Sequence, residues 1–144
     1  MAFLSSMNIA ASGLTAQRLR LDIAAENITN ADVTRTEAGG PYRRKLVVFE
    51  QIKGNTFRNM LSKAAGKTTA GVRVSEIIED QSPLRPVYNP EHPDANEEGY
   101  VMMPNVDVLK ETIDSMAATR AYEANITVLN AIKQMAAKAL EIGR

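Results

Sequence analysis

The sequence predicts an α+β protein, in which two long terminal helices pair as a coiled-coil-like inner domain and a small β-rich middle domain separates them along the chain. Three observations support this prediction. Proline is absent from residues 4–30 and 105–142, all six prolines lie between Pro41 and Pro104, and apolar residues near both ends recur at the helical steps of three and four. The expected domain limits are 1–34, 35–104 and 105–144.

The first helix is predicted over residues 4–30, with Ser5 or Ser6 as its N-cap. One apolar face, interrupted by Arg18, forms a seam expected to pack on the C-terminal helix: Leu4, Met7, Ala11, Leu14, Leu21, Ala25 and Ile28. At about 100° per residue, a second apolar group lies nearly opposite: Ile9, Ala16, Leu19 and Ile23. We expect this second face to contact neighbouring subunits, because an unpaired apolar stripe of such length marks a partner surface. The alternative is that the β-rich segment folds back over it.

The middle of the chain is predicted to contain strands and turns. A Gly-Gly-Pro turn at 39–41 leads into a strand over 42–51, and Gly71 opens a second strand over 72–78. Two short strands are expected at 87–88 and 100–103, because residues 89–94 between them are typical of a turn. Residues 53–70 are predicted to form a mobile loop.

The last helix is predicted to begin after Asp107 as N-cap and to end at Ile142, with Gly143 as C-cap. Four of its apolar residues are expected in the seam with the first helix: Val128, Ile132, Met135 and Ala139. Charged and amide side chains occupy a different side of the helix: Glu123, Asn130, Lys133, Gln134, Lys138 and Glu141. The helix is therefore expected to have a wide apolar arc and one continuous polar strip.

Composition excludes several classes of function. Seventeen basic and seventeen acidic residues cancel, so the chain lacks the excess charge that attracts nucleic acid or an anionic membrane. The absence of cysteine and the single histidine rule out thiolate chemistry and most metal centres. The longest apolar runs, such as that at 46–49, are far shorter than the roughly 20 residues that span a bilayer. The chain also begins without the basic segment of a secretory signal, so we expect no membrane insertion.

Motifs that suggest catalysis or ligand binding are all incomplete. The Gly-Lys-Thr at 66–68 lacks the earlier glycine that a phosphate-binding loop requires, since position 61 is Leu. His92 has no second histidine with which to hold a metal, so we interpret it as a turn residue. The basic run at 43–45 is interpreted as a charged strand entrance. We therefore expect no enzyme activity, no cofactor, no metal and no small-molecule substrate.

Several motifs together resemble those of the bacterial flagellar axial proteins, the family that makes the rod and hook. Residues 12–17 (SGLTAQ) and 21–31 (LDIAAENITNA) resemble the N-terminal signature of this family. Residues 41–50, 99–108 and 120–125 are similar to the proximal-rod branch of the family. The resemblance runs from end to end except for 53–70.

The resemblance implies a structural subunit of the basal-body rod, which stacks helically around an export channel and transmits torque from motor to hook. The polar strip would then line the channel. The implied partners are further copies of the chain, rod subunits of the FlgB, FlgF, FlgG and FliE types, and the flagellar type III export apparatus. The chain would be made in the cytoplasm and exported without cleavage to the rod, which crosses the periplasm. A soluble helical export adaptor or regulator that binds one partner without polymerising is the alternative.

Overall fold

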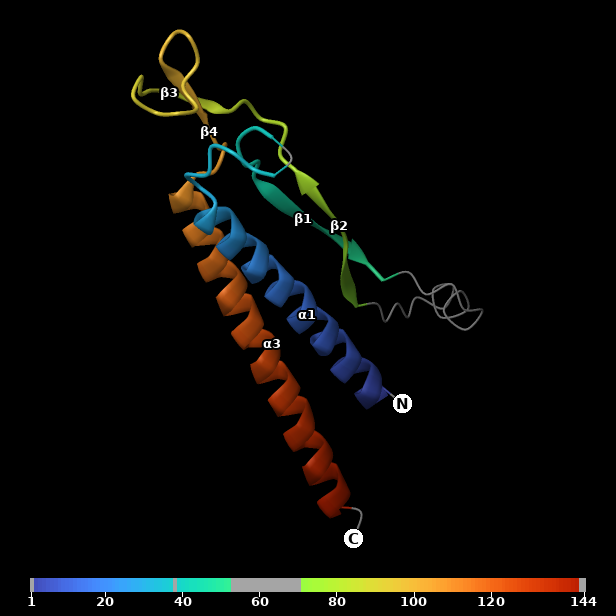
Figure 1. Ribbon diagram of the computed structural model, residues 1–144. Helices are drawn as coiled ribbons and strands as arrows, with labels where there is room; N and C mark the ends of the chain where they lie inside the picture. The colour runs from blue at the N-terminus through green and yellow to red at the C-terminus, as the bar shows by residue number, and fades with distance from the viewer. Residues whose placement is uncertain (1, 38, 53–70, 143–144) are drawn as a thin grey trace. The chain divides into compact units, whose positions relative to one another are not determined.

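The fold combines two long helices with two small sheets, as the computed structural model shows (Figure 1). The structure describes residues 2–37, 39–52 and 71–142. Helices α1 (Ala2–Thr29) and α3 (Val108–Ile142) pack together. The predicted α+β class with paired terminal helices is therefore confirmed. The predicted mobile loop at 53–70 and the predicted C-cap Gly143 lie outside the described residues.

The two long helices differ in how they begin. Asp107 caps α3 as predicted, because its Oδ1 accepts a hydrogen bond from the Leu109 backbone N–H at 3.0 Å. The prediction that Ser5 or Ser6 caps α1 is wrong, since the helix begins at Ala2 and both serines lie inside its first turns.

The strands form two hairpins. Strand β1 (Lys45–Gln51) pairs with β2 (Val72–Glu79), and β3 (Arg85–Tyr88) pairs antiparallel with β4 (Tyr100–Met103). Strand β1 begins three residues later than predicted, because neighbouring side and main chains take the hydrogen bonds of the residues before it. The Arg44 N–H donates to Asn105 Oδ1 at 2.8 Å, and the Tyr42 N–H donates to the Val33 carbonyl at 3.1 Å.

The chain divides into two compact units, each assembled from segments distant in the sequence. The first unit comprises Met1–Leu19, Val48–Glu76 and Ala118–Arg144, and the second comprises Arg20–Val47 and Ile77–Ala117. Both units therefore contain parts of α1, α3 and the β1–β2 hairpin. The domain limits at 34 and 105 remain a prediction.

In the first unit, small residues bring the two helices close together. A Cβ on Gly13 of α1 would lie 3.1 Å from Asn125 Nδ2 of α3, so glycine allows a close approach there. The buried apolar residues of this unit are mostly alanines: Ala10, Ala16, Ala118 and Ile132. The β2 strand is attached to α1 through Ser12, whose Oγ accepts a hydrogen bond from the Val72 N–H at 3.1 Å.

The second unit has a core around Tyr42. Tyr42 packs with Ala31 and Val106, and the half-buried Val33 packs against this cluster. Val101 of β4 is also buried. The most buried residues on the two helices of this unit include two polar ones, Asn27 and Glu111, at 1% and 2% exposed. Their position in a core is unusual, because such groups are rarely buried without partners.

Substitution of Gly71 tests the attachment of the β1–β2 hairpin to α1. A Cβ at this position would clash with Ser12 Oγ and would lie 3.0 Å from Ser12 Cβ. We expect Gly71→Ala to destabilise the protein by about 1–3 kcal/mol, since the Ser12 side chain, which accepts a hydrogen bond from the Val72 N–H, has to move. Urea unfolding measures the change. The double variant Gly71→Ala with Ser12→Gly removes both clashing atoms and should recover part of the loss; a fully stable Gly71→Ala would contradict this contact.

Candidate functional site

A cluster of five polar residues joins three segments of the second unit, and we call it the polar junction: Asn27, Tyr42, Arg44, Lys45 and Glu111. Asn27 is its centre. Its Nδ2 donates to the Lys45 carbonyl and to Glu111 Oε2, both at 2.9 Å. Its Oδ1 accepts from the Tyr42 hydroxyl and from the Lys45 N–H, again both at 2.9 Å. The amide thus uses both donors and both lone pairs, the full capacity of an asparagine side chain.

Glu111 supplies the negative charge of the polar junction. Its Oε1 accepts hydrogen bonds from Arg44 Nε at 2.7 Å and from Nη2 at 2.6 Å. With Asn27 on the other oxygen, both carboxylate oxygens have partners. A buried carboxylate is tolerated only when it is paired and hydrogen-bonded in this way.

Further polar contacts surround the polar junction. Arg44 Nη2 also lies 3.5 Å from Asp114, which pairs with Arg20 of α1 at 3.0 Å. The Asp80 N–H donates to the Arg44 carbonyl at 2.8 Å, and Asn105 Nδ2 donates to the Asp80 carbonyl at 3.0 Å. The end of α1, the start of β1, the end of β2 and the first turns of α3 are therefore held by directional bonds.

The surroundings shift two pKa values. Burial, followed by the nearby carboxylates of Glu26, Glu111 and Glu79, raises the pKa of Tyr42 to about 12. Hydrogen bonds from the Ser82 side chain and backbone, reinforced by Arg44 and Arg43, hold the pKa of Asp80 below its ordinary value. The surroundings therefore favour the neutral phenol of Tyr42, which donates a hydrogen bond to Asn27, and the ionised carboxylate of Asp80, which accepts hydrogen bonds from Ser82.

The arrangement of these groups is structural. The donors and acceptors of the Asn27 amide and the Glu111 carboxylate are engaged within the chain, which leaves none for a substrate. Across the described ranges, no three His, Asp or Glu residues gather as metal ligands. His92 lies in the β3–β4 turn, where its Nδ1 accepts a hydrogen bond from the Asp94 N–H at 3.1 Å.

The residues predicted for the helix seam differ widely in burial. Ile132 is buried at 8% exposed, and Met7, Leu14, Leu21 and Ile28 are half-buried. The remaining six are exposed: Leu4, Ala11, Ala25, Val128, Met135 and Ala139. The described helix contacts instead involve Gly13, Arg20 and Asn27, which lie on a neighbouring side of α1. The seam assignment for the whole set remains a prediction.

The residues predicted to contact neighbouring subunits lie on the side of α1 that carries Ser12 and Glu26. Val72 bonds to Ser12 in the first unit, and Lys45 pairs with Glu26 in the second. Ala16 and Ile23 are buried within the single chain, at 3% and 8% exposed, whereas Leu19 is half-buried and Ile9 is exposed. Whether this side of α1 contacts neighbouring subunits remains a prediction for all four residues.

The predicted polar strip of α3 is fully accessible. All six of its residues are exposed: Glu123, Asn130, Lys133, Gln134, Lys138 and Glu141. Lys138 and Glu141 form an ion pair at 2.8 Å, and the strip contains two lysines and two glutamates, so its charges cancel. Neither described helix is long and apolar enough to cross a membrane.

Comparisons with known proteins agree with this architecture. Residues 7–35 match the family model described as "Flagella basal body rod protein", and residues 97–142 match "Flagellar basal body rod FlgEFG protein C-terminal". The chain is 50% identical to the flagellar basal-body rod protein FlgC of Bacillus subtilis, covering 96% of this chain and 97% of that protein. The chain belongs to the FlgC family of rod proteins. It is likewise 45% identical to FlgC of Escherichia coli O6:H1 and 44% identical to that of Borreliella burgdorferi, over at least 98% of each chain.

The FlgC family is a structural, non-enzymatic family of the flagellar basal-body rod, and the chain is a structural subunit of that rod. This agrees with a central cluster whose hydrogen bonds are used internally. The sequence analysis did not identify Asn27, Arg44 or Glu111 as a cluster. Asn27 shares a face of α1 with the buried Ala24, and Glu111 shares a face of α3 with the buried Ala118. This helical spacing is the sequence signal that could have placed both polar residues in the interior.

Removal of the Glu111 side chain tests the polar junction. Glu111→Ala leaves the Asn27 amide and the Arg44 guanidinium short of a partner, so we expect a loss of about 3 kcal/mol in the free energy of unfolding. Glu111→Gln keeps the shape and one acceptor and should lose less. Urea denaturation provides the measurement, with the exposed Glu98→Ala as control. Equal stabilities for Glu111→Ala and Glu98→Ala would show that the polar junction is unimportant.

The raised pKa of Tyr42 predicts a specific alkaline transition. Because the folded state favours the neutral phenol, its contribution to stability is complete below pH 10 and is lost as the pH rises toward 12. We expect the free energy of unfolding to fall over this interval, and to fall less in Tyr42→Phe. Denaturation of both proteins from pH 8 to 12 measures the difference. Parallel curves would contradict the assignment.

Proposed function

We propose that the chain builds the proximal rod by stacking helically, with copies of itself and with rod subunits of the FlgB, FlgF, FlgG and FliE types, around an export channel. The observation that carries this proposal is the division of α3 into three sides. At about 100° per residue, one side is buried and includes Glu111, Ala118 and Ile132. A second side is exposed and apolar: Ile113, Val128 and Met135. The third side is the polar strip.

The polar strip suits a channel wall. A conduit for unfolded chains needs a surface that stays wet and does not hold apolar segments, and charged and amide side chains predominate on the strip. Its two lysines and two glutamates produce little net field on passing substrates. The apolar side of α3 suits contacts with neighbouring subunits, because exposed apolar faces of this length require cover.

The polar junction supports a role in torque transmission. Torque applied to a rod subunit pulls its elements past one another, and apolar packing alone resists sliding weakly because it has no direction. The hydrogen bonds of Asn27 and Glu111 fix one register of α1, β1 and α3. A subunit so joined deforms little when its neighbours turn it.

Export through the flagellar type III apparatus without cleavage is the route we infer for this chain. The core of the first unit is rich in alanine and buries few large side chains, so unfolding this unit for passage costs little in hydrophobic free energy. Refolding is then completed by neighbours that cover the exposed apolar residues. The family resemblance supplies the identity of the apparatus.

Cysteine labelling tests the placement of the polar strip. The native chain has no cysteine, so Asn130→Cys and Gln134→Cys introduce single thiols. Both should react freely with a bulky, impermeant thiol reagent in the isolated chain and in denatured rods. In intact rods we expect labelling to fall at least about tenfold, because the reagent does not enter the channel. Equal labelling in intact and denatured rods would refute a channel position.

A further inference from the structure

The outer face of the β3–β4 hairpin is an exposed apolar surface, which we call the tyrosine face: Pro86, Tyr88, Tyr100 and Met102. The register places Pro86 opposite Met102 and Tyr88 opposite Tyr100, and alternate residues of a strand share a face. The two tyrosine rings meet edge to face with centroids 5.4 Å apart. Tyr88 is 66% exposed and Met102 is 48% exposed, whereas Val101 on the other face is buried.

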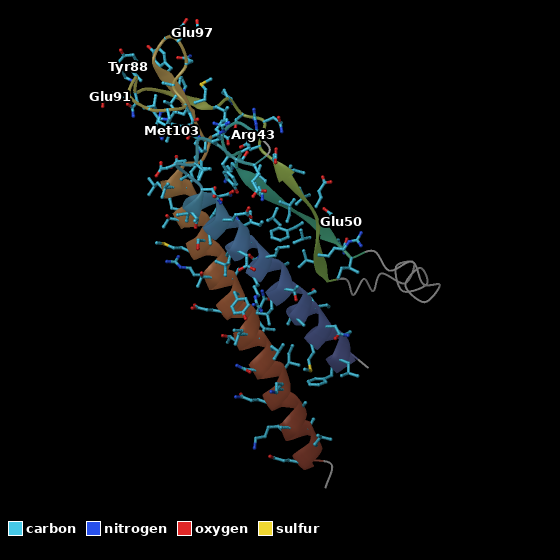
Figure 2. The ribbon with its side chains drawn as sticks, viewed as in Figure 1. Arg43, Glu50, Tyr88, Glu91, Glu97 and Met103 are labelled. Carbon is cyan, nitrogen blue, oxygen red and sulfur yellow. The ribbon has the colours of Figure 1, made fainter. Side chains whose placement is uncertain are left out.

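The rim of the tyrosine face is acidic. Glu91, Glu97 and Glu98 lie in the loop that joins the two strands, all three exposed, and none forms an ion pair within the described residues. Figure 2 shows Tyr88, Glu91 and Glu97 on this hairpin and its connecting loop. An aromatic and methionine centre with a charged rim has the composition of a protein interface rather than of ordinary surface.

The first turns of α3 carry a surface of opposite charge, which we call the basic stripe: Leu109, Lys110, Ile113, Met116 and Arg120. Its three apolar residues are 57–70% exposed. The helical period places Lys110 and Arg120 beside them. Both charged residues are basic and exposed, and neither forms an ion pair with another described residue.

We propose that the tyrosine face of one copy docks on the basic stripe of a second copy of the chain. Each surface pairs an apolar centre with unpaired charges, and the charges are complementary. Both surfaces are exposed within a single chain, so neither covers the other there, and each is accessible to a second copy.

The two surfaces differ, so the contact is heterologous, and repetition of such a contact produces an open helical array rather than a closed dimer. This inference rests on the proposed helical assembly and names the surfaces that carry one of its contacts. The surfaces are small, so the contact is weak between free chains and is strengthened when several contacts form together in the rod.

Crosslinking in rods tests the contact directly. We combine Met102→Cys and Ile113→Cys in one chain, isolate rods, and treat them with a short bifunctional maleimide. The double variant should form a ladder of linked chains, and neither single variant should crosslink to itself. Rods that contain the double variant without any ladder would overturn this contact and leave the proposed function standing. Dimers from a single variant would reveal a symmetric contact and overturn it as well.

Charge reversal provides a second readout that does not depend on the cysteines being tolerated. Glu97→Lys with Glu98→Lys, or Lys110→Glu with Arg120→Glu, should each lower the recovery of rods at least about threefold, as expected for two exposed ion pairs. Combining all four substitutions should restore most of it. Arg18→Glu on α1 is the control and should not rescue the Glu97 and Glu98 reversals. Purely additive defects would overturn the contact, whereas absence of the native chain from purified rods would contradict the proposed function itself.

Discussion

The four hydrogen bonds of the Asn27 amide are the interaction on which the rest of the second unit depends. They connect the last turn of α1 to the first residue of β1 and, through Glu111, to the first turn of α3. The apolar core around Tyr42 provides burial but little directionality, because the hydrophobic effect is non-directional. The polar junction supplies the missing specificity, a use of buried polar groups known from other folds.

The exposed apolar side chains of the chain bear on its assembly. A chain whose interior is fixed by polar bonds and small residues keeps many large apolar side chains on its surface, among them Leu109, Ile113, Met135 and Leu140. Such a surface is a liability for a free monomer and a requirement for a subunit. Membership of the FlgC family implies assembly with other rod subunits, and our proposal assigns these residues to contacts with such neighbours.

Much of the fold was predictable from the sequence. Proline placement and helical periodicity located α1 and α3, and Asp107 marked a helix start because its side chain has a purely local role. The contacts of Asn27, Glu111 and Arg44 were not predictable, since their partners are 15 to 84 residues away and polar side chains ordinarily indicate solvent. The attachment of β2 to α1 was missed likewise, because it depends on one hydroxyl, that of Ser12.

Hydrogen exchange of the free chain and of isolated rods tests most directly whether the polar junction organises the subunit and assembly completes it. The backbone N–H groups of Tyr42, Arg44 and Lys45 are all hydrogen-bonded within the chain. They should be protected in both states, whereas the far end of α3 should gain protection only in rods. Rapid exchange at these three N–H groups in the free chain, or equal protection of α3 in both states, would contradict the account.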